Sequence, residues 1–372
     1  MRDAATTAVA TSPEPAQKRT TQRETAVTDS AFSLLDAIPV PLVLLGPTER
    51  VVHANPPAVA LFSRDLPGRH YITAFRAPAV LSCVEAVMSG TVDRAEDRLL
   101  VSDSTREATW KITASAVDEG GRRSVVVAFE DTTALQEAGQ IRRDFVANVS
   151  HELRTPLTAL LGFIETLRGA AKDDSAARER FLGIMEREAG RMNRLVRDLL
   201  SLSRVEAEER QRPTDPVDLA GILNSVTLSL RPVAEEQKVE LFVTGTSGPC
   251  IVPGDADQLA QVFTNLVENA VKYSGARSQV TIALSLNDHD AALRGPSVSV
   301  RVKDDGEGLD PIHIPRLTER FYRVDSHRSR EQGGTGLGLA IVKHIVNRHR
   351  GRLRIESAPG QGAEFTVTLP AG

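Results

Sequence analysis

Residues Phe145–Leu157 read FVANVSHELRTPL, with His151 at the centre of the stretch. The apolar residues around it recur at the spacing of one helical face: Ile141, Phe145, Val149, Leu153, Leu157, Leu160, Ile164 and Leu167. Because an α-helix turns by roughly 100° per residue, His151 points away from that face. The neighbours of His151 are small or polar: Ala147, Arg154, Thr155 and Thr158. A lone histidine here is most simply a surface residue, and the alternative interpretation is an exposed nucleophile.

The composition is that of an ordinary globular protein. The chain has 372 residues, of which 41% are hydrophobic and 25% are charged, and this length predicts about two to three domains. The net charge of −4 gives no general reason to expect a nucleic-acid or lipid partner. Cys83 and Cys250 lie far apart, which argues against a disulfide and suits a reducing cytoplasm.

No membrane-spanning segment is predicted. The most apolar window, Ile38–Leu45, is much shorter than the roughly 20 residues that a spanning helix needs, and it contains two prolines. We therefore expect a cytoplasmic protein with no transmembrane segment of its own, which a partner could recruit to the inner membrane.

The patterns indicate a multidomain α+β protein. Residues 1–29 are rich in Ala, Thr, Pro and charge, and they predict a disordered leader. Residues 30–131 show two strands, a middle of helices and a returning hairpin, and this order resembles a PAS sensor domain. The stretches VVHAN and FEDTT resemble signatures of that domain.

Residues 132–212 predict an antiparallel helical hairpin. Two amphipathic helices are expected over 133–170 and 176–208, and Pro156 predicts a local kink just after the histidine. A single hairpin would leave part of its apolar stripe exposed, so pairing two hairpins into a dimeric four-helix bundle is the expected way to bury it. Residues 213–372 alternate strands with helices, as an α/β layer structure does.

Two polar clusters in the C-terminal part could bind a nucleotide. In QVFTNLVENAVKYS, the side chains of Asn265, Asn269 and Lys272 share one helical face, which suits a hydrated Mg²⁺ and phosphate oxygens. The alternative is an ordinary solvated face. In VKDDGEGL, a strand ends at Asp304, whose carboxylate could accept a hydrogen bond from an exocyclic amine such as that of adenine. Many surface turns share that second pattern.

A glycine-rich turn opens the last apolar helix. The stretch Gly333–Ile345 reads GGTGLGLAIVKHI, and the N-terminus of such a helix offers free N–H groups to a polyphosphate. LTERFYRVD and HRSREQGG precede this turn, and the second of them is expected to form a mobile lid carrying Arg328 and Arg330. Each motif alone is common, but their order and spacing together are specific.

Over about residues 30–372 the chain resembles the sensor histidine kinases of two-component systems. FVANVSHELRTPL resembles the phosphoacceptor box of that family, and NLVENAVKYS, DDGEGL, TERFYRVD and GGTGLGLAIV resemble its N, first glycine, F and second glycine boxes. The resemblance implies a PAS domain, a dimerisation and phosphotransfer hairpin, and a GHKL-type α/β sandwich that binds ATP. A different ATPase of the same nucleotide fold, such as a chaperone or topoisomerase relative, would lack the HELRTP helix.

The resemblance also implies a role for each matching residue. His151 would accept the γ-phosphate of ATP, Glu152 would take the proton from its other nitrogen, and Thr155 would position water to dephosphorylate the partner. Asn265 and Asn269 would hold Mg²⁺. The remaining ATP-binding residues would be Lys272, Tyr273, Asp304, Gly306, Gly308, Gly334, Gly336, Leu337 and Gly338. Because these boxes are intact, a catalytically dead scaffold is disfavoured.

The combination of PRLTERFYRVD, the lid and GGTGLGLAIVKH looks most like the PhoR-type kinases of phosphate-starvation signalling, and the phosphoacceptor box and the ERFYRVD stretch also favour that subgroup. That subgroup implies a bifunctional kinase and phosphatase that forms a homodimer and acts on the receiver domain of a PhoB-like response regulator. A membrane transporter or a PhoU-like complex is a candidate source of the signal. A PAS-containing kinase of another pathway, for example of the nitrogen type, remains the alternative.

Overall fold

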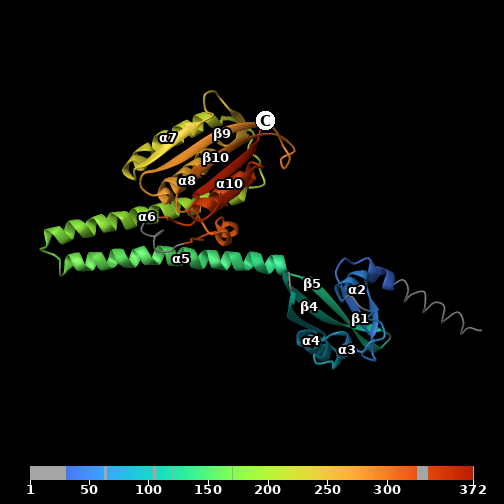
Figure 1. Ribbon diagram of the computed structural model, residues 1–372. Coiled ribbons are helices and arrows are strands. Elements are labelled where there is room, and N and C mark those ends of the chain that lie inside the picture. The colour runs from blue at the N-terminus through green and yellow to red at the C-terminus, as the bar shows by residue number, and fades with distance from the viewer. Residues whose placement is uncertain are drawn as a thin grey trace, which may run out of the picture. The chain divides into compact units, whose positions relative to one another are not determined.

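The computed structural model describes residues 31–62, 65–103, 106–119, 121–169, 171–324 and 334–371. The chain divides into two compact units, Met1–Asp144 and Phe145–Gly372 (Figure 1). The predicted leader over 1–29 and the predicted lid residues Arg328 and Arg330 lie outside the described residues.

The N-terminal unit is built on one antiparallel sheet with the strand order β2-β1-β5-β4-β3. Its strands are β1 (Leu42–Leu45), β2 (Val51–Ala54), β3 (Arg94–Asp103), β4 (Arg106–Glu119) and β5 (Arg122–Asp131). The helices between β2 and β3 are α2 (Pro56–Phe62), α3 (Tyr71–Ala74) and α4 (Pro78–Met88). This order of two strands, helices and returning strands confirms the predicted PAS-like arrangement.

A buried asparagine fixes the start of this sheet. Asn55, at the end of the VVHAN stretch, accepts hydrogen bonds from the backbone N–H groups of Leu42 and Ala58. Its side-chain amide donates to the carbonyls of Leu35, Ile38 and Val40. A buried carboxamide persists only when its donors and acceptors are paired, so Asn55 has a structural role here.

Two long helices follow, α5 (Thr133–Arg168) and α6 (Ser175–Glu208). α5 runs unbroken through Pro156. The Asp174 side chain caps α6 by accepting the N–H groups of Ala176 and Ala177. Part of the apolar stripe on α5 stays open, as expected for one hairpin, since Leu157 is 49% exposed and Ile164 is 40% exposed.

The C-terminal part is a sheet with helices on one face. Its helices are α7 (Leu219–Glu236), α8 (Ala256–Ser274), the short η1 (Pro311–Arg316) and α10 (Gly338–Arg348). Its strands are β6 (Asp215–Asp218), β7 (Val239–Thr244), β8 (Ile251–Gly254), β9 (Ser278–Asp290), β10 (Gly295–Asp304), β11 (Arg352–Ser357) and β12 (Ala363–Pro370).

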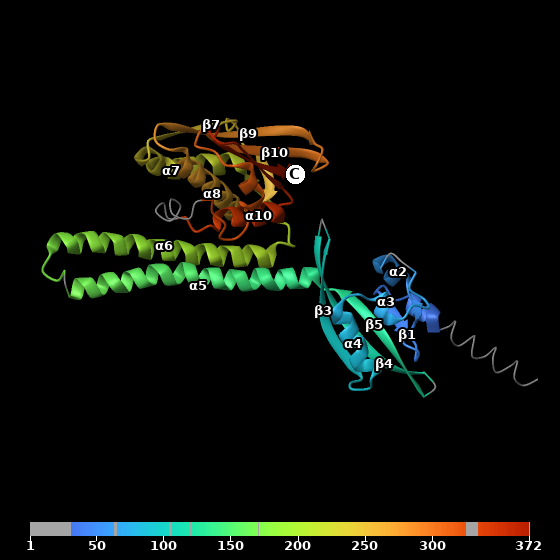
Figure 2. The same cartoon turned by 60° about the horizontal axis from the view of Figure 1, so that its bottom comes forward.

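The main sheet of this part has the order β11-β12-β10-β9-β7, and β6 pairs with β8 separately. Only the β7–β9 pair of these described strands is parallel. Helices α7, α8 and α10 lie along one face of the sheet (Figure 2). The predicted multidomain α+β fold, with an α/β layer in the C-terminal part, is thereby confirmed.

None of the helices within the described ranges combines the length and the hydropathy that crossing a bilayer requires.

Candidate functional site

The first wall of the site is helix α8. The Asp255 side chain caps it by accepting the N–H of Gln258. Its inner face is fully buried, because apolar residues recur there at helical spacing: Leu259, Phe263, Leu266 and Ala270. Asn265, Asn269 and Lys272 lie on another face and are half-buried. The predicted separation of the apolar and polar faces is confirmed.

The polar side chains of α8 differ in how they are engaged. The Asn265 amide donates to the backbone carbonyl of Gly338 across 3.3 Å, which leaves its Oδ1 directed elsewhere. Among the described residues, Asn269 has no hydrogen-bond partner. The Lys272 ammonium lies 4.9 Å from the ring centroid of Tyr273, and this ring is 45% exposed. α8 therefore carries two carboxamides and a cation on one face, and of these Asn265 contacts the start of α10.

Asp304 ends strand β10 in a buried position, with 4% of its surface exposed. Its Oδ1 accepts the backbone N–H groups of Gly306 at 3.0 Å and Ala363 at 3.2 Å. Burial raises the pKa of the Asp304 carboxyl, and the two N–H donors oppose that rise in part. Both bonds end on Oδ1, so Oδ2 can accept a hydrogen bond from a ligand amine.

The glycines bring separate segments close together. A Cβ at Gly306 would clash with the backbone carbonyl oxygen of Tyr273 at the end of α8. Gly308 has a φ of +66°, and a Cβ there would clash with the carbonyl oxygen of Ala358. Only glycine fits such close backbone approaches. The turn after β10 is thereby held against the last turn of α8.

The second glycine turn leads into α10. Gly336 has a φ of +74° and lies against the backbone of Phe321. Leu337 is fully buried and immediately precedes the helix, whose first residue is Gly338. Gly334 is the first described residue after the gap at 325–333. The N-terminus of α10 thus faces α8, and its N–H groups are available to an anion.

On α5, His151 is exposed, and within the described residues its imidazole makes no hydrogen bond or ion pair. Glu152 instead forms an ion pair with Arg191 of α6 at 2.5 Å. The Thr155 hydroxyl donates to the backbone carbonyl of His151 across 3.2 Å. The His151 imidazole is therefore left open, whereas the side chains of Glu152 and Thr155 both make contacts within the hairpin.

The sequence motifs did not reveal the contacts between α6 and the nucleotide-binding layer. The hydroxyl of Thr335, in the second glycine turn, donates to the Asp198 carboxylate on α6 at 2.7 Å. Arg320 pairs with Glu206 of α6 at 2.6 Å. Burial raises the pKa of Asp198, while the Thr335 hydrogen bond opposes the rise. These partners lie more than a hundred residues apart, and no local pattern signals them.

A metal at this site would depend on the ligand for part of its coordination. No group of three or more His, Cys, Asp or Glu side chains in the described part of the chain could hold a metal ion. The oxygens of Asn265 and Asn269 are hard, neutral ligands of the kind that Mg²⁺ accepts together with phosphate oxygens and water. These residues fit a Mg²⁺ ion carried in with a polyphosphate.

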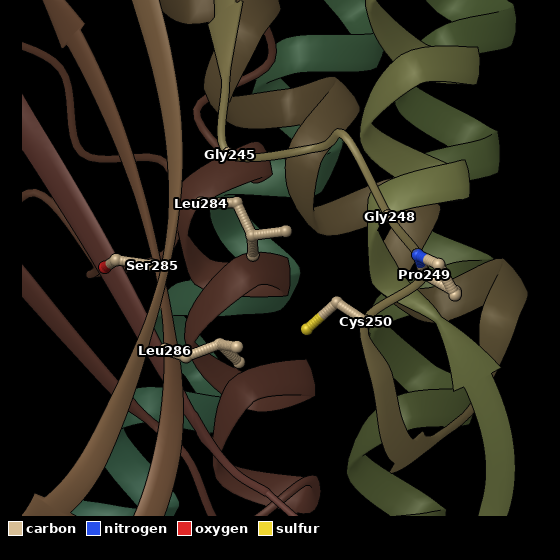
Figure 3. Close-up of a pocket in the computed structure, with 7 residues that line it drawn as sticks. All are labelled: Gly245, Gly248, Pro249, Cys250, Leu284, Ser285 and Leu286. Atoms are coloured by element: carbon tan, nitrogen blue, oxygen red, sulfur yellow. The ribbon is translucent and has the colours of Figure 1, made fainter.

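A separate cavity of 290 Å³ lies between β9 and the segment that leads into β8 (Figure 3). Leu284, Leu286 and Cys250 line it, and the Cys250 sulfur points into it. Burial raises the pKa of this thiol, which disfavours the reactive thiolate. None of the predicted nucleotide-binding residues lines this cavity, so it is distinct from the site described above.

Two ranges of this chain match known domain families. Residues 141–208 match the His Kinase A (phospho-acceptor) domain. Residues 254–372 match the histidine kinase-, DNA gyrase B- and HSP90-like ATPases. The first match contains α6 and most of α5, and the second contains α8, Asp304 and both glycine turns.

Named relatives match over the same region. The chain is 42% identical to the phosphate regulon sensor protein PhoR of Pseudomonas aeruginosa, over 66% of this chain and 54% of that protein. It is 36% identical to the sensor histidine kinase WalK of Bacillus subtilis, over 68% of this chain and 40% of that protein. The chain thus spans about half the length or less of these curated relatives.

The chain is also similar to a solved structure, the Acinetobacter baumannii histidine kinase AdeS. The identity is 25% and the TM-score is 0.46, over 60% of this chain and 98% of that chain.

Proposed function

The chain belongs to the sensor histidine kinases of two-component systems, and on that premise we propose that it uses ATP to phosphorylate its own His151. The observation that supports this proposal most directly is the exposure of the His151 side chain. Its imidazole is exposed and unengaged within the described residues, on a helix that matches the phospho-acceptor domain. An ATPase-type layer in the same unit supplies the phosphate donor that such a nucleophile needs.

The proposed reaction moves the γ-phosphoryl group of ATP onto the imidazole of His151. One imidazole nitrogen of His151 attacks the γ-phosphorus, a P–N bond forms, and the P–O bond to the departing ADP breaks. The proton on the other ring nitrogen must then leave, and Glu152 is the adjacent carboxylate that could accept it. Because Glu152 pairs with Arg191, we propose that this pair orients the carboxylate and that the proton transfer requires the pair to loosen.

The nucleotide would bind between α8, the end of β10 and the start of α10. Asp304 would accept the adenine amine through Oδ2, and the turns that contain Gly306, Gly308, Gly334, Gly336 and Gly338 would line the nucleotide pocket. Lys272 would meet the phosphates, and Tyr273 would lie along the nucleotide beside the buried Leu337. Asn265 and Asn269 would hold Mg²⁺, which supplies charge neutralisation at the phosphates when bound.

We further propose a homodimer. The exposed apolar residues Leu157, Leu161 and Ile164 continue the stripe that the single α5–α6 hairpin does not cover. A second hairpin packed against this stripe would complete a four-helix bundle and remove the apolar surface from water.

The proposed downstream partner is the receiver domain of a response regulator, which would take the phosphoryl group from His151 onto an aspartate. Thr155, one turn beyond His151, would position water for the reverse dephosphorylation. We propose phosphate-starvation signalling with a PhoB-like regulator as the pathway, on the likeness of the phosphoacceptor box and the ERFYRVD stretch to PhoR-type kinases. The identities, 42% to PhoR and 40% to the WalK protein of Staphylococcus haemolyticus, do not distinguish the two subgroups. Phosphotransfer to purified receiver domains tests this, and faster transfer to another regulator would contradict it.

A substitution at the phosphoacceptor tests the central proposal. We expect His151→Gln to abolish acid-labile labelling from ATP that carries the label on its γ-phosphate. Affinity for ADP, measured by calorimetry, should stay unchanged because the substitution lies outside the nucleotide-binding residues. Lys172→Gln, an exposed position in the loop after α5, serves as the control and should label normally. Labelling of the His151→Gln protein would overturn the assignment.

A further inference from the structure

The outer face of the main sheet in the C-terminal part holds a second, polar groove. Helices α7, α8 and α10 cover the other face, and no helix of the described residues covers this one (Figure 2). The groove has a volume of 840 Å³ and is lined by side chains of β9, β10, β11 and β12. Cavities of this size hold small molecules in other proteins. Asp304 faces the helices, so the groove lies on the opposite side of the sheet from the proposed nucleotide site.

The groove follows from which side chains share this face. Residues alternate between the faces of a strand, so Thr366 and Thr368 of β12 point outward together. Across the ladder, Thr366 lies between Arg354 of β11 and Arg301 of β10. In the next row, Thr368 lies opposite Arg352. Short hydroxyl side chains therefore form the floor along β12, and long arginines stand on both sides of it.

The hydroxyl floor extends over the neighbouring strands. Ser299 of β10 lies opposite Thr368, and their hydroxyl oxygens are 3.2 Å apart. The Asn287 amide donates to the Ser299 hydroxyl across 2.9 Å. This network fixes the rotamers of the floor and leaves Thr366, beside two arginines, without a hydrogen-bond partner among the described residues.

The cations on this face outnumber their counter-ions at the centre of the groove. Arg354 pairs with Glu356 at 2.7 Å. Arg301 and Arg352 are exposed, and neither makes an ion pair within the described part of the chain. Two unpaired guanidinium groups therefore flank the hydroxyl floor, in the arrangement that recognises phosphate or carboxylate oxygens.

The remaining acidic residues of the groove lie toward its ends. Glu364 is opposite Lys303 and Glu356, one row beyond Thr366. Asp290 ends β9 and accepts two backbone N–H groups of the turn that follows. Neither carboxylate neutralises Arg301 and Arg352 at the centre of the groove. An anion bound over β12 would therefore complement the charge of these two arginines.

We propose that this groove binds a small oligoanion with two or more phosphate or carboxylate groups. Arg301 and Arg352 bind its charged groups, and Thr366 donates a hydrogen bond from the floor. One phosphate would occupy only part of 840 Å³, which favours a ligand with several anionic groups. The proposal is independent of the kinase assignment, because it uses no residue of the nucleotide site.

The test is a calorimetric titration of the full chain, first saturated with Mg-ADP so that the nucleotide site is occupied. Tripolyphosphate is the probe in one arm and citrate in the other, which separates phosphate from carboxylate recognition. We expect one further binding event for at least one of them. The double variant R301Q/R352Q should weaken it by about tenfold or more per arginine lost.

Arg231→Gln is the matched control, since Arg231 is an exposed arginine of α7 without an ion pair among the described residues. This control should keep the wild-type affinity for the probe, and all proteins should keep their affinity for Mg-ADP. The absence of a second binding event, or equal probe affinity in R301Q/R352Q and the wild type, would overturn the proposal. Binding of an acidic peptide such as poly-glutamate without binding of either small anion would also overturn it, in favour of a protein partner.

Discussion

His151 on α5 and His349 after α10 have opposite surroundings. The His151 imidazole is exposed and has no partner among the described residues. The His349 ring is 1% exposed, its Nε2 accepts the backbone N–H of Asp255 at 3.0 Å, and its Nδ1 donates to the Ile345 carbonyl at 2.8 Å. The two backbone partners fix the neutral tautomer of His349, since an N–H can only donate and a carbonyl can only accept.

The two histidines differ in how much of their hydrogen-bonding capacity the fold uses. His349 joins the end of α10 to the start of α8, and its neighbour Arg348 pairs with Asp255 and with Glu208 of α6. All of its hydrogen-bonding capacity is used within the fold. His151 makes no such contact among the described residues, and this difference underlies our proposal that it is the nucleophile.

The largest expected effect is on stability. His349→Ala should lower the free energy of unfolding by about 2–4 kcal/mol, because it leaves a cavity and two unpaired buried backbone groups. His151→Ala should change it by less than about 0.5 kcal/mol, as for other exposed positions. Urea denaturation followed by circular dichroism measures both. Equal losses of unfolding free energy in the two variants would contradict the proposed difference between a structural His349 and an unengaged His151.

The next expected effect is on nucleotide affinity. Asp304→Asn can keep the bonds from Gly306 and Ala363 through Oδ1, but it presents an amide donor where Oδ2 accepted. We expect affinity for ADP to fall about 10- to 100-fold. Because burial raises the pKa of this carboxyl, its ionised form opposes folding at neutral pH, so the variant should also be more stable.

Asp305→Asn is the control for that experiment, since it changes the adjacent carboxylate and leaves Asp304 in place. It should retain the affinity for ADP. An Asp304→Asn protein that binds ADP normally would remove Asp304 from the proposed site. A less stable Asp304→Asn protein would show that the carboxylate has a structural role.

A smaller effect is expected from pH. Burial lowers the pKa of His349 below its ordinary value of 6.5, so the unfolded chain binds the proton more readily. The stabilising contribution of neutral His349 is therefore complete above about pH 6.5 and is lost as the pH falls toward the folded pKa, by at most about 1.4 kcal/mol per pH unit. Denaturation curves between pH 7 and 5.5 measure it, and His349→Gln should lose this part of the slope. An unchanged slope would contradict the prediction.

Local patterns predicted the elements well because helix periodicity and caps are local properties. The sequence placed the second long helix at 176–208, and α6 spans Ser175–Glu208. The same holds for the polar face of α8, where i, i+4 spacing alone puts Asn265 and Asn269 together. The residue pairs that link elements were not predictable. Glu152 and Arg191 meet only because the hairpin places α5 beside α6, and no spacing within one helix encodes that contact.

The smallest effect tests how firmly the nucleotide-binding layer is held on α6. If His151 must meet a nucleotide, the contacts between this layer and α6 should be individually weak so that they can exchange. The Thr335–Asp198 hydrogen bond is half-buried, and Thr335→Val should cost about 1 kcal/mol of unfolding free energy. Arg320 and Glu206 are partly exposed, so Arg320→Gln should cost less, about 0–1 kcal/mol. A loss above about 3 kcal/mol for either variant would indicate a rigid interface, and His151 would then have to be reached without rearrangement of these contacts.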